Sequence, residues 1–272
     1  MDTLPFYKMS ASGNDFILID DRESIVERQY KDLAYFVERV CRRRHSVGAD
    51  GLILVRRSEA CDFSWRFFNA DGSEAEMCGN GGRCVARFAF LNGIAGESMA
   101  FETLAGVMKA SIKNGNRVKL QLTSPRDISL DYPIALENRE LFVNSVNTGV
   151  PHVILLTDDI EHTPVEELGR LVRYHGAFAP KGTNVDFVKV LDRKNLQIRT
   201  YERGVEGETY ACGTGAVAAG VILKEKGLSE GAVNIHTRGG EILQVYVQGD
   251  EVYLEGTANV IYTAQLSAEA VE

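Results

Sequence analysis

The chain contains one short motif twice, at a constant separation. Residues 74–83 include the pair Cys78-Gly79, and residues 208–216 include the pair Cys212-Gly213. The offset of 134 residues that relates Cys78 to Cys212 also relates later glycines, threonines and valines in the two halves, without a gap. An internal repeat that relates residues 74–118 to residues 208–252 predicts two copies of one structural unit, each of which presents a Cys-Gly pair at a turn.

The repeat also predicts how the chain is divided. A chain of 272 residues can form two ordinary domains. We expect an N-terminal half over residues 1–126, which a C-terminal strand over 263–272 could join, and a C-terminal half over residues 127–262. The irregular segment between Pro125 and Pro133 marks the boundary. We expect the active site in the cleft between the halves.

Composition and charge limit the possible partners. The chain is 44% hydrophobic and 25% charged, which is typical of a globular protein. A formal net charge of −8 argues against nucleic acid or a membrane surface as a partner. No apolar stretch approaches the roughly 20 residues needed to span a bilayer. Residues 1–5 lack the basic and apolar regions of a signal peptide, and five cysteines is an odd number, so we expect a cytoplasmic protein with free thiols.

The hydrophobic pattern predicts an α+β fold. Many short strands alternate with one apolar helix in each half, over residues 82–91 and 215–226. This pattern favours two pseudo-symmetric domains, each a curved, mostly antiparallel, barrel-like sheet around a central helix. Apolar residues at helical spacing predict a further helix over residues 23–43, and Thr163 is the expected N-cap of another, with Pro164 at its first position.

The two Cys-Gly turns place a thiol at the N-terminal end of each central helix. The unpaired N–H groups and partial positive charge there are expected to lower the thiol pKa toward neutrality. The same groups can hold a carboxylate and stabilise the negative charge that forms when the adjacent carbon loses a proton. Inversion at a carbon needs one base on each face, and a duplicated unit with one thiol per copy can supply both.

Other interpretations of these residues remain open. Buried cysteines often only pack, and this is the interpretation for Cys41, Cys61 and Cys84. The spacing of the cysteines does not match a redox Cys-x-x-Cys pair or a zinc site, so no metal is expected. Asn14 could bind a ligand through its amide, but the motif alone favours a role only in the turn in which it lies. Without a family comparison, His152 is interpreted as a structural histidine at a strand edge.

With both motifs and their flanks considered, the chain resembles the diaminopimelate epimerases over nearly its whole length. The similarity is carried by five blocks in a specific order: Gly13-Asn14-Asp15-Phe16, Phe68-Asn69-Ala70-Asp71-Gly72-Ser73, Met77-Cys78-Gly79-Asn80-Gly81-Gly82-Arg83, Gly182-Thr183-Asn184, and residues 201–215 with Tyr201-Glu202-Arg203-Gly204 and Ala211-Cys212-Gly213-Thr214-Gly215.

The resemblance implies an amino-acid epimerase without a cofactor that interconverts LL- and meso-diaminopimelate in lysine and peptidoglycan-precursor synthesis. Cys78 and Cys212 would be the acid/base pair, with His152 and Glu202 tuning or orienting the thiols. Backbone donors of Gly79-Asn80 and Gly213-Thr214 would hold the carboxylate at the reacting carbon. The remaining substrate contacts implied are Asn14, Asn69, Asn184, Glu202 and Arg203. The family also implies a homodimer.

The sequence departs from the family pattern at two positions. Val150 stands where many members have an asparagine, and Gly51 where some have a glutamine that contacts substrate. Both changes concern recognition of the distal end of the substrate. The alternatives are a proline or hydroxyproline racemase or a phenazine-type isomerase of the same fold, a non-catalytic amino-acid-binding protein, and a thiol redox sensor.

Overall fold

The computed structural model describes residues 4–137 and 139–272, so part of the segment used above to argue against a signal peptide lies outside the described chain. Residue contacts divide the chain into two compact units. One holds the chain up to Leu120 together with Thr257–Glu272, and the other is Gln121–Gly256. The halves expected at 1–126 and 127–262, and the cleft expected between them, stay predictions.

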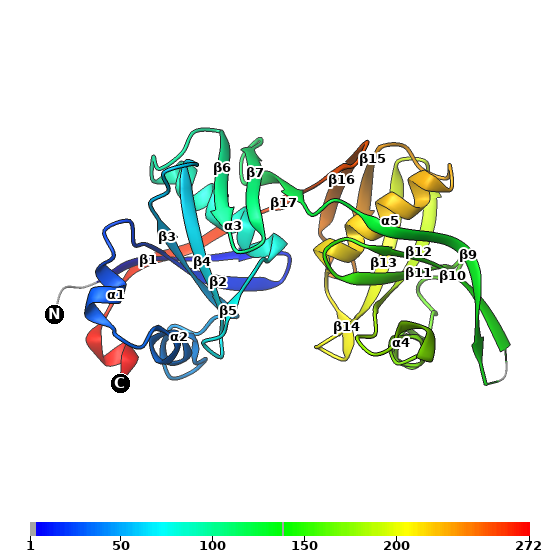
Figure 1. Cartoon of the computed structure of the whole chain (residues 1–272), viewed down its shortest axis with the longest axis horizontal. Coiled ribbons are helices and arrows are strands. Elements are labelled where there is room, and N and C mark those ends of the chain that lie inside the picture. The colour runs from blue at the N-terminus through cyan, green and yellow to red at the C-terminus, as the bar shows by residue number, and fades with distance from the viewer. Residues whose placement is uncertain (1–3, 138) are drawn as a thin grey trace. The chain divides into compact units, whose positions relative to one another are not determined.

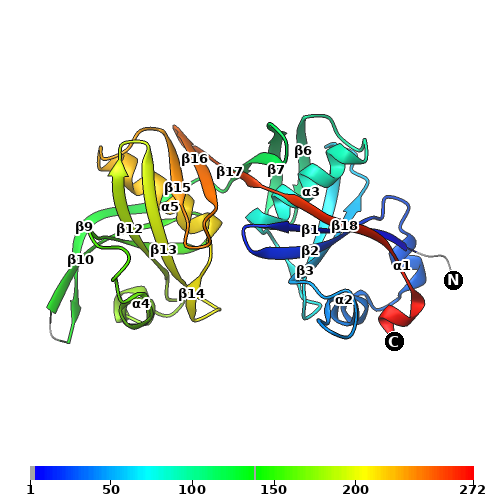
Figure 2. The same ribbon diagram turned by 180° about the vertical axis from the view of Figure 1, so that it is seen from behind.

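The first unit is a mixed sheet in which antiparallel pairs predominate (Figures 1 and 2). Following the hydrogen-bonded pairs from one strand to the next gives the order β18, β1, β2, β3, β4, β6, β7, β8, with the short β5 also beside β4. The strands are β1 (Leu4–Ala11), β2 (Asn14–Asp20), β3 (Gly51–Arg56), β4 (Phe63–Asn69), β5 (Glu74–Ala75), β6 (Ser98–Thr103), β7 (Gly106–Ile112), β8 (Arg117–Leu122) and β18 (Asn259–Leu266).

The second unit repeats this arrangement. Its order is β9, β10, β11, β12, β13, β15, β16, β17, with the short β14 also beside β13. In both units the third and fifth pairs of the series are parallel and the others are antiparallel. The strands are β9 (Arg126–Leu136), β10 (Arg139–Asn147), β11 (Pro151–Leu156), β12 (Asn184–Asp192), β13 (Asn195–Glu202), β14 (Gly207–Thr209), β15 (Ala232–His236), β16 (Ile242–Gln248) and β17 (Glu251–Thr257).

A central helix packs against the strands of each unit. These are α3 (Gly79–Leu91), which contacts β1, β2, β3 and β7, and α5 (Gly213–Glu225), which contacts β10, β11, β12, β13, β15 and β16. Every residue of α5 from Gly215 to Leu223 is buried, as expected for a helix that is apolar on all sides. The predicted α+β class, with two pseudo-symmetric domains each built around a central helix, is therefore confirmed.

Shorter helices complete each unit. They are α1 (Ile25–Gln29), α2 (Leu33–Cys41), α4 (Val165–Arg173), and the 3₁₀ turns η1 (Gly176–Phe178) and η2 (Ala268–Val271). The apolar side of α2 packs with β2 and β3, through Phe36, Val37 and Val40. In the second unit, Val165 and Val172 of α4 pack with β11, β12 and β13. Among the described residues, no helix combines the length and apolar character needed to cross a bilayer.

Three local predictions were wrong. The single helix expected over residues 23–43 is divided into α1 and α2, because the Asp32 side chain accepts from Tyr35 N–H and caps a new helix. The N-cap of α4 is Pro164, since the Thr163 hydroxyl donates to Asp159 O instead. The segment between Pro125 and Pro133, expected to be irregular, contributes to β9, which pairs with β10. Apolar residues do alternate along β9, at Ile128, Leu130, Tyr132, Ile134 and Leu136, although most of the strand is exposed. The prediction gave more weight to the two prolines than to this alternation.

Candidate active site

The first unit holds Cys78 at the start of α3. Cys78 is the N-cap residue, with extended backbone (φ −144°, ψ 119°), and its Sγ accepts a hydrogen bond from Gly81 N–H at 3.5 Å. Sulfur thus takes the place of the oxygen that usually caps a helix. The side chain is partly exposed, and the N–H donor beside it can stabilise negative charge on the sulfur. This is the local environment that the Cys-Gly turn predicts.

A chain of amides links the start of α3 to the β1–β2 turn. Asn80 Nδ2 donates to Asn14 Oδ1 at 2.8 Å, and Asn14 Nδ2 donates to Asp50 Oδ2 at 3.0 Å. The fully buried Arg83 donates to Asn80 Oδ1 at 2.9 Å and to Ser12 Oγ at 2.6 Å. Asn14 and Asn80 are therefore held together beside Cys78. Each amide still has one hydrogen or lone pair that a ligand could use.

Asn69 lies at the end of β4, opposite Gly51 of β3. Its side chain is exposed and donates to Ser73 Oγ at 3.1 Å, and within residues 4–137 and 139–272 it is not hydrogen-bonded to Asn14 or Asn80. A Cβ on Gly51 would come within 2.6 Å of Phe68 O and 2.7 Å of the Phe67 ring. A larger residue at position 51 therefore requires both the Phe68 backbone and the Phe67 ring to move.

The second unit holds Cys212 at the start of α5, where it is the N-cap residue and is buried. Four side chains form a continuous row of contacts from its sulfur into the core. Cys212 Sγ lies 3.4 Å from Thr214 Oγ1, which lies 2.9 Å from His152 Nε2. His152 Nδ1 lies 2.7 Å from Asp186 Oδ2, and both side chains are fully buried. The structure thus brings three of the predicted residues, Cys212, Thr214 and His152, into direct contact.

The remaining predicted residues of this unit come from β12, β13 and the loop after β13. Asn184, which pairs in register with His152, donates to Pro151 O at 3.0 Å and accepts from Arg203 N–H at 2.9 Å. The Arg203 guanidinium donates to Lys181 O at 3.3 Å. Glu202 ends β13 and is half-buried. Asn184 thus fixes the backbone where Glu202 is followed by Arg203.

Burial and two carboxylates determine the acidity of Cys212. Burial, followed by the negative charges of Glu202 and Asp186, raises the pKa of the Cys212 thiol above its ordinary value. Burial also raises the pKa of the Glu202 carboxyl, and the charge of Asp186 adds to this. The prediction that the helix end lowers the thiol pKa is therefore wrong for Cys212. Loss of water and two nearby carboxylates outweigh the helix end here, so the resting group is a protonated thiol.

This environment predicts a slow and pH-dependent alkylation of Cys212. Because the thiolate is the reactive form, a raised pKa lowers the rate of alkylation at neutral pH and shifts its rise to higher pH. We expect Glu202→Gln to speed alkylation of Cys212, since removal of a negative neighbour favours the thiolate. Iodoacetamide labelling from pH 6 to 10, quantified by peptide mass spectrometry, measures this. Urea-unfolded protein is the control, and equal rates in folded and unfolded chains would contradict the prediction.

Several residues of this site were not singled out from the sequence. Asp186 accepts from Thr200 Oγ1 at 2.7 Å as well as contacting His152, and the buried Thr148 donates to Thr214 O at 3.1 Å. The signal for Asp186 was an acidic residue inside the apolar strand Val185–Val188, because a buried carboxylate requires partners. Gly215 is required beside it, since a Cβ there would lie 2.3 Å from Asp186 Oδ1.

The other cysteines are separate from these contacts. Cys41 and Cys84 are buried, and burial raises the pKa of each thiol to about 12. These two therefore fit the packing roles expected for them. Cys61 is partly exposed and precedes β4. No group of three or more His, Cys, Asp or Glu side chains in residues 4–137 and 139–272 could hold a metal ion.

Comparison with known proteins identifies the family that the chain is similar to. The family model described as diaminopimelate epimerase matches residues 6–128 and 144–261. A diaminopimelate epimerase of Aquifex aeolicus (strain VF5) is 45% identical over 279 residues, covering 99% of this chain and all of that protein. The diaminopimelate epimerase of Archaeoglobus fulgidus is 41% identical over 271 residues, covering 95% of each chain.

Solved structures show the same fold at much lower identity. A phenazine biosynthesis protein of the PhzF family from Bacillus anthracis has a TM-score of 0.73 at 16% identity, covering 98% of this chain and 100% of that one. A hydroxyproline epimerase from Agrobacterium vitis has a TM-score of 0.67 at 17% identity, covering 98% of this chain and 93% of that one. At this identity the likeness concerns the fold alone. Because the family model and the sequence relatives cover nearly the whole chain, the protein belongs to the diaminopimelate epimerase family of isomerases.

Proposed function

We propose that this protein interconverts LL- and meso-diaminopimelate by removing the proton from one Cα and returning a proton to the opposite face, with Cys78 and Cys212 as the two acid/base groups. The observation that carries the proposal is the repeated placement of a cysteine at the N-cap of a central helix, in two units with the same strand order. Membership of the family supplies the substrate class.

The proposed reaction balances with the two thiols alone. One cysteine, as thiolate, takes the Cα proton and becomes a thiol, and the electron pair of the broken C–H bond is delocalised into the substrate carboxylate. The other cysteine, as thiol, gives its proton to the opposite face of Cα and becomes a thiolate. The enzyme is then set for the reverse direction. The mechanism requires that both sulfurs reach one substrate carbon.

The contacts of Cys212 suit this exchange of roles. Every polar atom is satisfied if His152 Nδ1–H donates to Asp186, Thr214 O–H donates to His152 Nε2, and the Cys212 thiol donates to Thr214 Oγ1. Burial keeps the thiol protonated, as an acid requires. When Cys212 must act as a base, its proton can pass through Thr214 to His152, and Asp186 stabilises the resulting imidazolium.

The helix ends and nearby amides are proposed to hold the substrate. Backbone N–H groups at Gly79-Asn80 and Gly213-Thr214 lie in the first turns of α3 and α5, where a carboxylate is stabilised. These donors would also stabilise the charge that develops when Cα loses its proton. The distal amino and carboxylate groups are assigned to Asn14, Asn69, Asn184, Glu202 and Arg203.

The proposal also covers the location, cofactor requirement and assembly of the enzyme. On the resemblance to the family, the enzyme is proposed to work in the cytoplasm without a cofactor and as a homodimer. Analytical ultracentrifugation at micromolar concentration tests the assembly. A single species of about 60 kDa, twice the chain mass of 30.0 kDa, is the expected result.

A substrate comparison in deuterium oxide tests the proposed function. Wild-type protein is incubated with LL-diaminopimelate, meso-diaminopimelate or trans-4-hydroxy-L-proline, and deuterium at Cα is followed by mass spectrometry. We expect labelling and inversion of both diaminopimelate isomers and none of hydroxyproline. Labelling of hydroxyproline alone would assign the protein to the racemase alternative. No labelling of any of the three would favour a binding protein or a thiol sensor.

A further inference from the structure

Each cysteine turn is preceded by an arginine–glutamate pair with the same geometry. In the first unit, Arg66 Nε and Nη2 donate to the two carboxylate oxygens of Glu74 at 2.8 and 2.9 Å. In the second, Arg199 Nε and Nη2 donate to the two oxygens of Glu208 at 2.7 and 2.6 Å. Both pairs use the same edge of the guanidinium. Two parallel, charge-assisted hydrogen bonds fix direction as well as distance.

The two pairs also occupy equivalent positions in their sheets. Glu74 of β5 lies opposite Phe68 of β4, two residues beyond Arg66. Glu208 of β14 lies opposite Tyr201 of β13, two residues beyond Arg199. In each unit the arginine is thus the diagonal cross-strand neighbour of the glutamate. The glutamate precedes the N-cap cysteine by four residues in both units.

The strands that carry these glutamates have few other constraints on their register. β5 contains two residues and β14 contains three, so few backbone hydrogen bonds fix either strand. A slip of one residue would move the following chain by about 3.3 Å. Because the cysteine follows within four residues, such a slip would displace its sulfur from the N-cap position. A bidentate pair on the strand itself opposes this movement.

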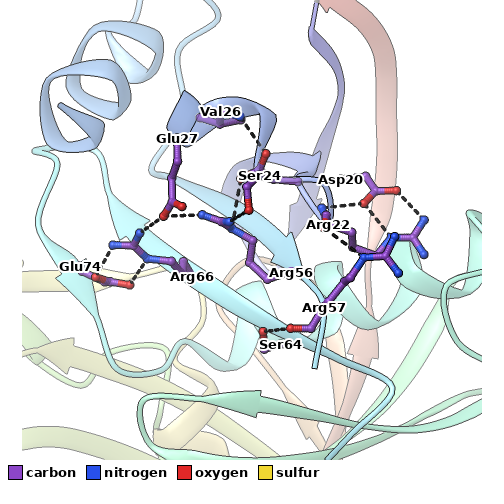
Figure 3. A network of polar contacts seen from close by, with 11 residues as sticks. Asp20, Arg22, Ser24, Val26, Glu27, Arg56, Arg57, Ser64, Arg66 and Glu74 are labelled. Atoms are coloured by element: carbon purple, nitrogen blue, oxygen red, sulfur yellow. Dashed lines mark hydrogen bonds and ion pairs between the residues drawn. The ribbon is translucent and has the colours of Figure 1, made fainter. Parts of the chain in front are cut away.

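Both arginines are anchored on their remaining side. Arg66 Nη1 donates to Glu27 of α1 at 2.7 Å, and Glu27 also pairs with Arg56 at 2.5 Å, as Figure 3 shows. Arg199 Nη1 donates to Ile160 O, Glu161 O and Thr163 O at 2.9 to 3.1 Å. The Arg66 side chain is 34% exposed and that of Arg199 is 12% exposed. The guanidinium is thus tied to the body of its own unit in both cases.

We infer that Arg66–Glu74 and Arg199–Glu208 are paired positioning clamps, each of which holds the cysteine turn of its own unit in register. The clamps act through the strand and the turn that lead to each cysteine. Arg66 lowers the pKa of the Glu74 carboxyl, which keeps that clamp ionised at neutral pH. The inference rests on the proposed roles of Cys78 and Cys212, but the geometry repeats independently of them.

Alkylation of each cysteine in clamp variants tests the inference. Glu74→Gln removes the negative charge and one of the two oxygens that accept hydrogen bonds from Arg66. Glu208→Gln does the same for Arg199 in the second unit. We expect Glu74→Gln to lower the iodoacetamide rate of Cys78 about tenfold and leave Cys212 unchanged, because displacement from the N-cap removes the N–H donor that stabilises the Cys78 thiolate. Glu208→Gln should raise the rate of Cys212 about tenfold and leave Cys78 unchanged, because displacement exposes a buried thiol. Steady-state turnover should fall about 10- to 100-fold with little change in KM.

Controls separate a clamp from a general loss of stability. Glu23→Gln breaks an exposed ion pair with Arg57 in the first unit, and neither residue belongs to β5. This variant should leave the alkylation rates of both cysteines unchanged. If a glutamine variant does not fold, Arg66→Lys and Arg199→Lys replace it. Lysine keeps the positive charge but cannot form the two parallel hydrogen bonds, so the alkylation rates of the two cysteines can be compared in the same way. Unchanged alkylation of both cysteines, or equal changes of both in each variant, would overturn the inference. This readout does not need turnover, so failure of the proposed function would appear separately.

Discussion

Alanine in place of Cys78 or of Cys212 is expected to lower epimerisation of diaminopimelate by about 10³- to 10⁴-fold in both directions. Each thiol is the only proton donor or acceptor assigned to its face of Cα, so net inversion stops when either is lost. The measurement is kcat/KM for the LL- and meso-isomers with each variant. Substrate binding should persist, because the helix-end N–H groups of both units remain.

Cys61→Ala is the matched control for these variants. Cys61 is also partly exposed and lies in the first unit, but it precedes β4 and is not part of the turn that leads into α3. We expect this variant to keep wild-type turnover. Turnover above one tenth of the wild-type rate in either Cys78→Ala or Cys212→Ala would contradict the assignment of the two bases.

The second large effect is expected at a residue that the sequence did not single out. Asp186→Asn should lower kcat by about 10²- to 10³-fold with little change in KM. An asparagine amide can donate to His152 Nδ1, which would leave the proton on Nε2. His152 could then no longer accept from the Thr214 hydroxyl, and the proton path from Cys212 would be interrupted.

A second aspartate of the same strand is the control for this variant. Asp192 ends β12 and is exposed, so Asp192→Asn should retain wild-type kcat. Thermal unfolding of both variants shows whether Asp186→Asn remains folded. His152→Gln and Asp186→Asn combined should cost no more than His152→Gln alone, because both interrupt one path. Additive losses would show that Asp186 acts in some other way.

Much of the architecture could be predicted from the sequence because of the repeat. The offset that relates Cys78 to Cys212 implied two like units before any strand was assigned, and α5 is apolar on so many sides that only a central position suits it. The placement of a thiol at each helix start followed from the glycines after Cys78 and Cys212. These features are local in sequence and therefore visible in it.

The charge environment of Cys212 in the second unit could not be predicted from the sequence. Asp186 and Cys212 are separated by 26 residues, and only the packing of α5 against β12 brings the carboxylate near the sulfur. The sequence indicated a helix end that lowers the thiol pKa, whereas burial beside Glu202 and Asp186 raises it. Likewise, the Arg66–Glu74 pair depends on strand register, which hydrophobic pattern alone does not specify for a two-residue strand.

The position of deuterium during the first turnovers tests the two-base account most directly. Wild-type enzyme is given LL-diaminopimelate in deuterium oxide, and substrate and product are separated and analysed below about 5% conversion, where each molecule has in general reacted only once. The account predicts that the meso product carries one deuterium at the inverted carbon while recovered LL substrate carries none. A product that retains its original protium, or recovered substrate labelled as fast as product forms, would contradict it.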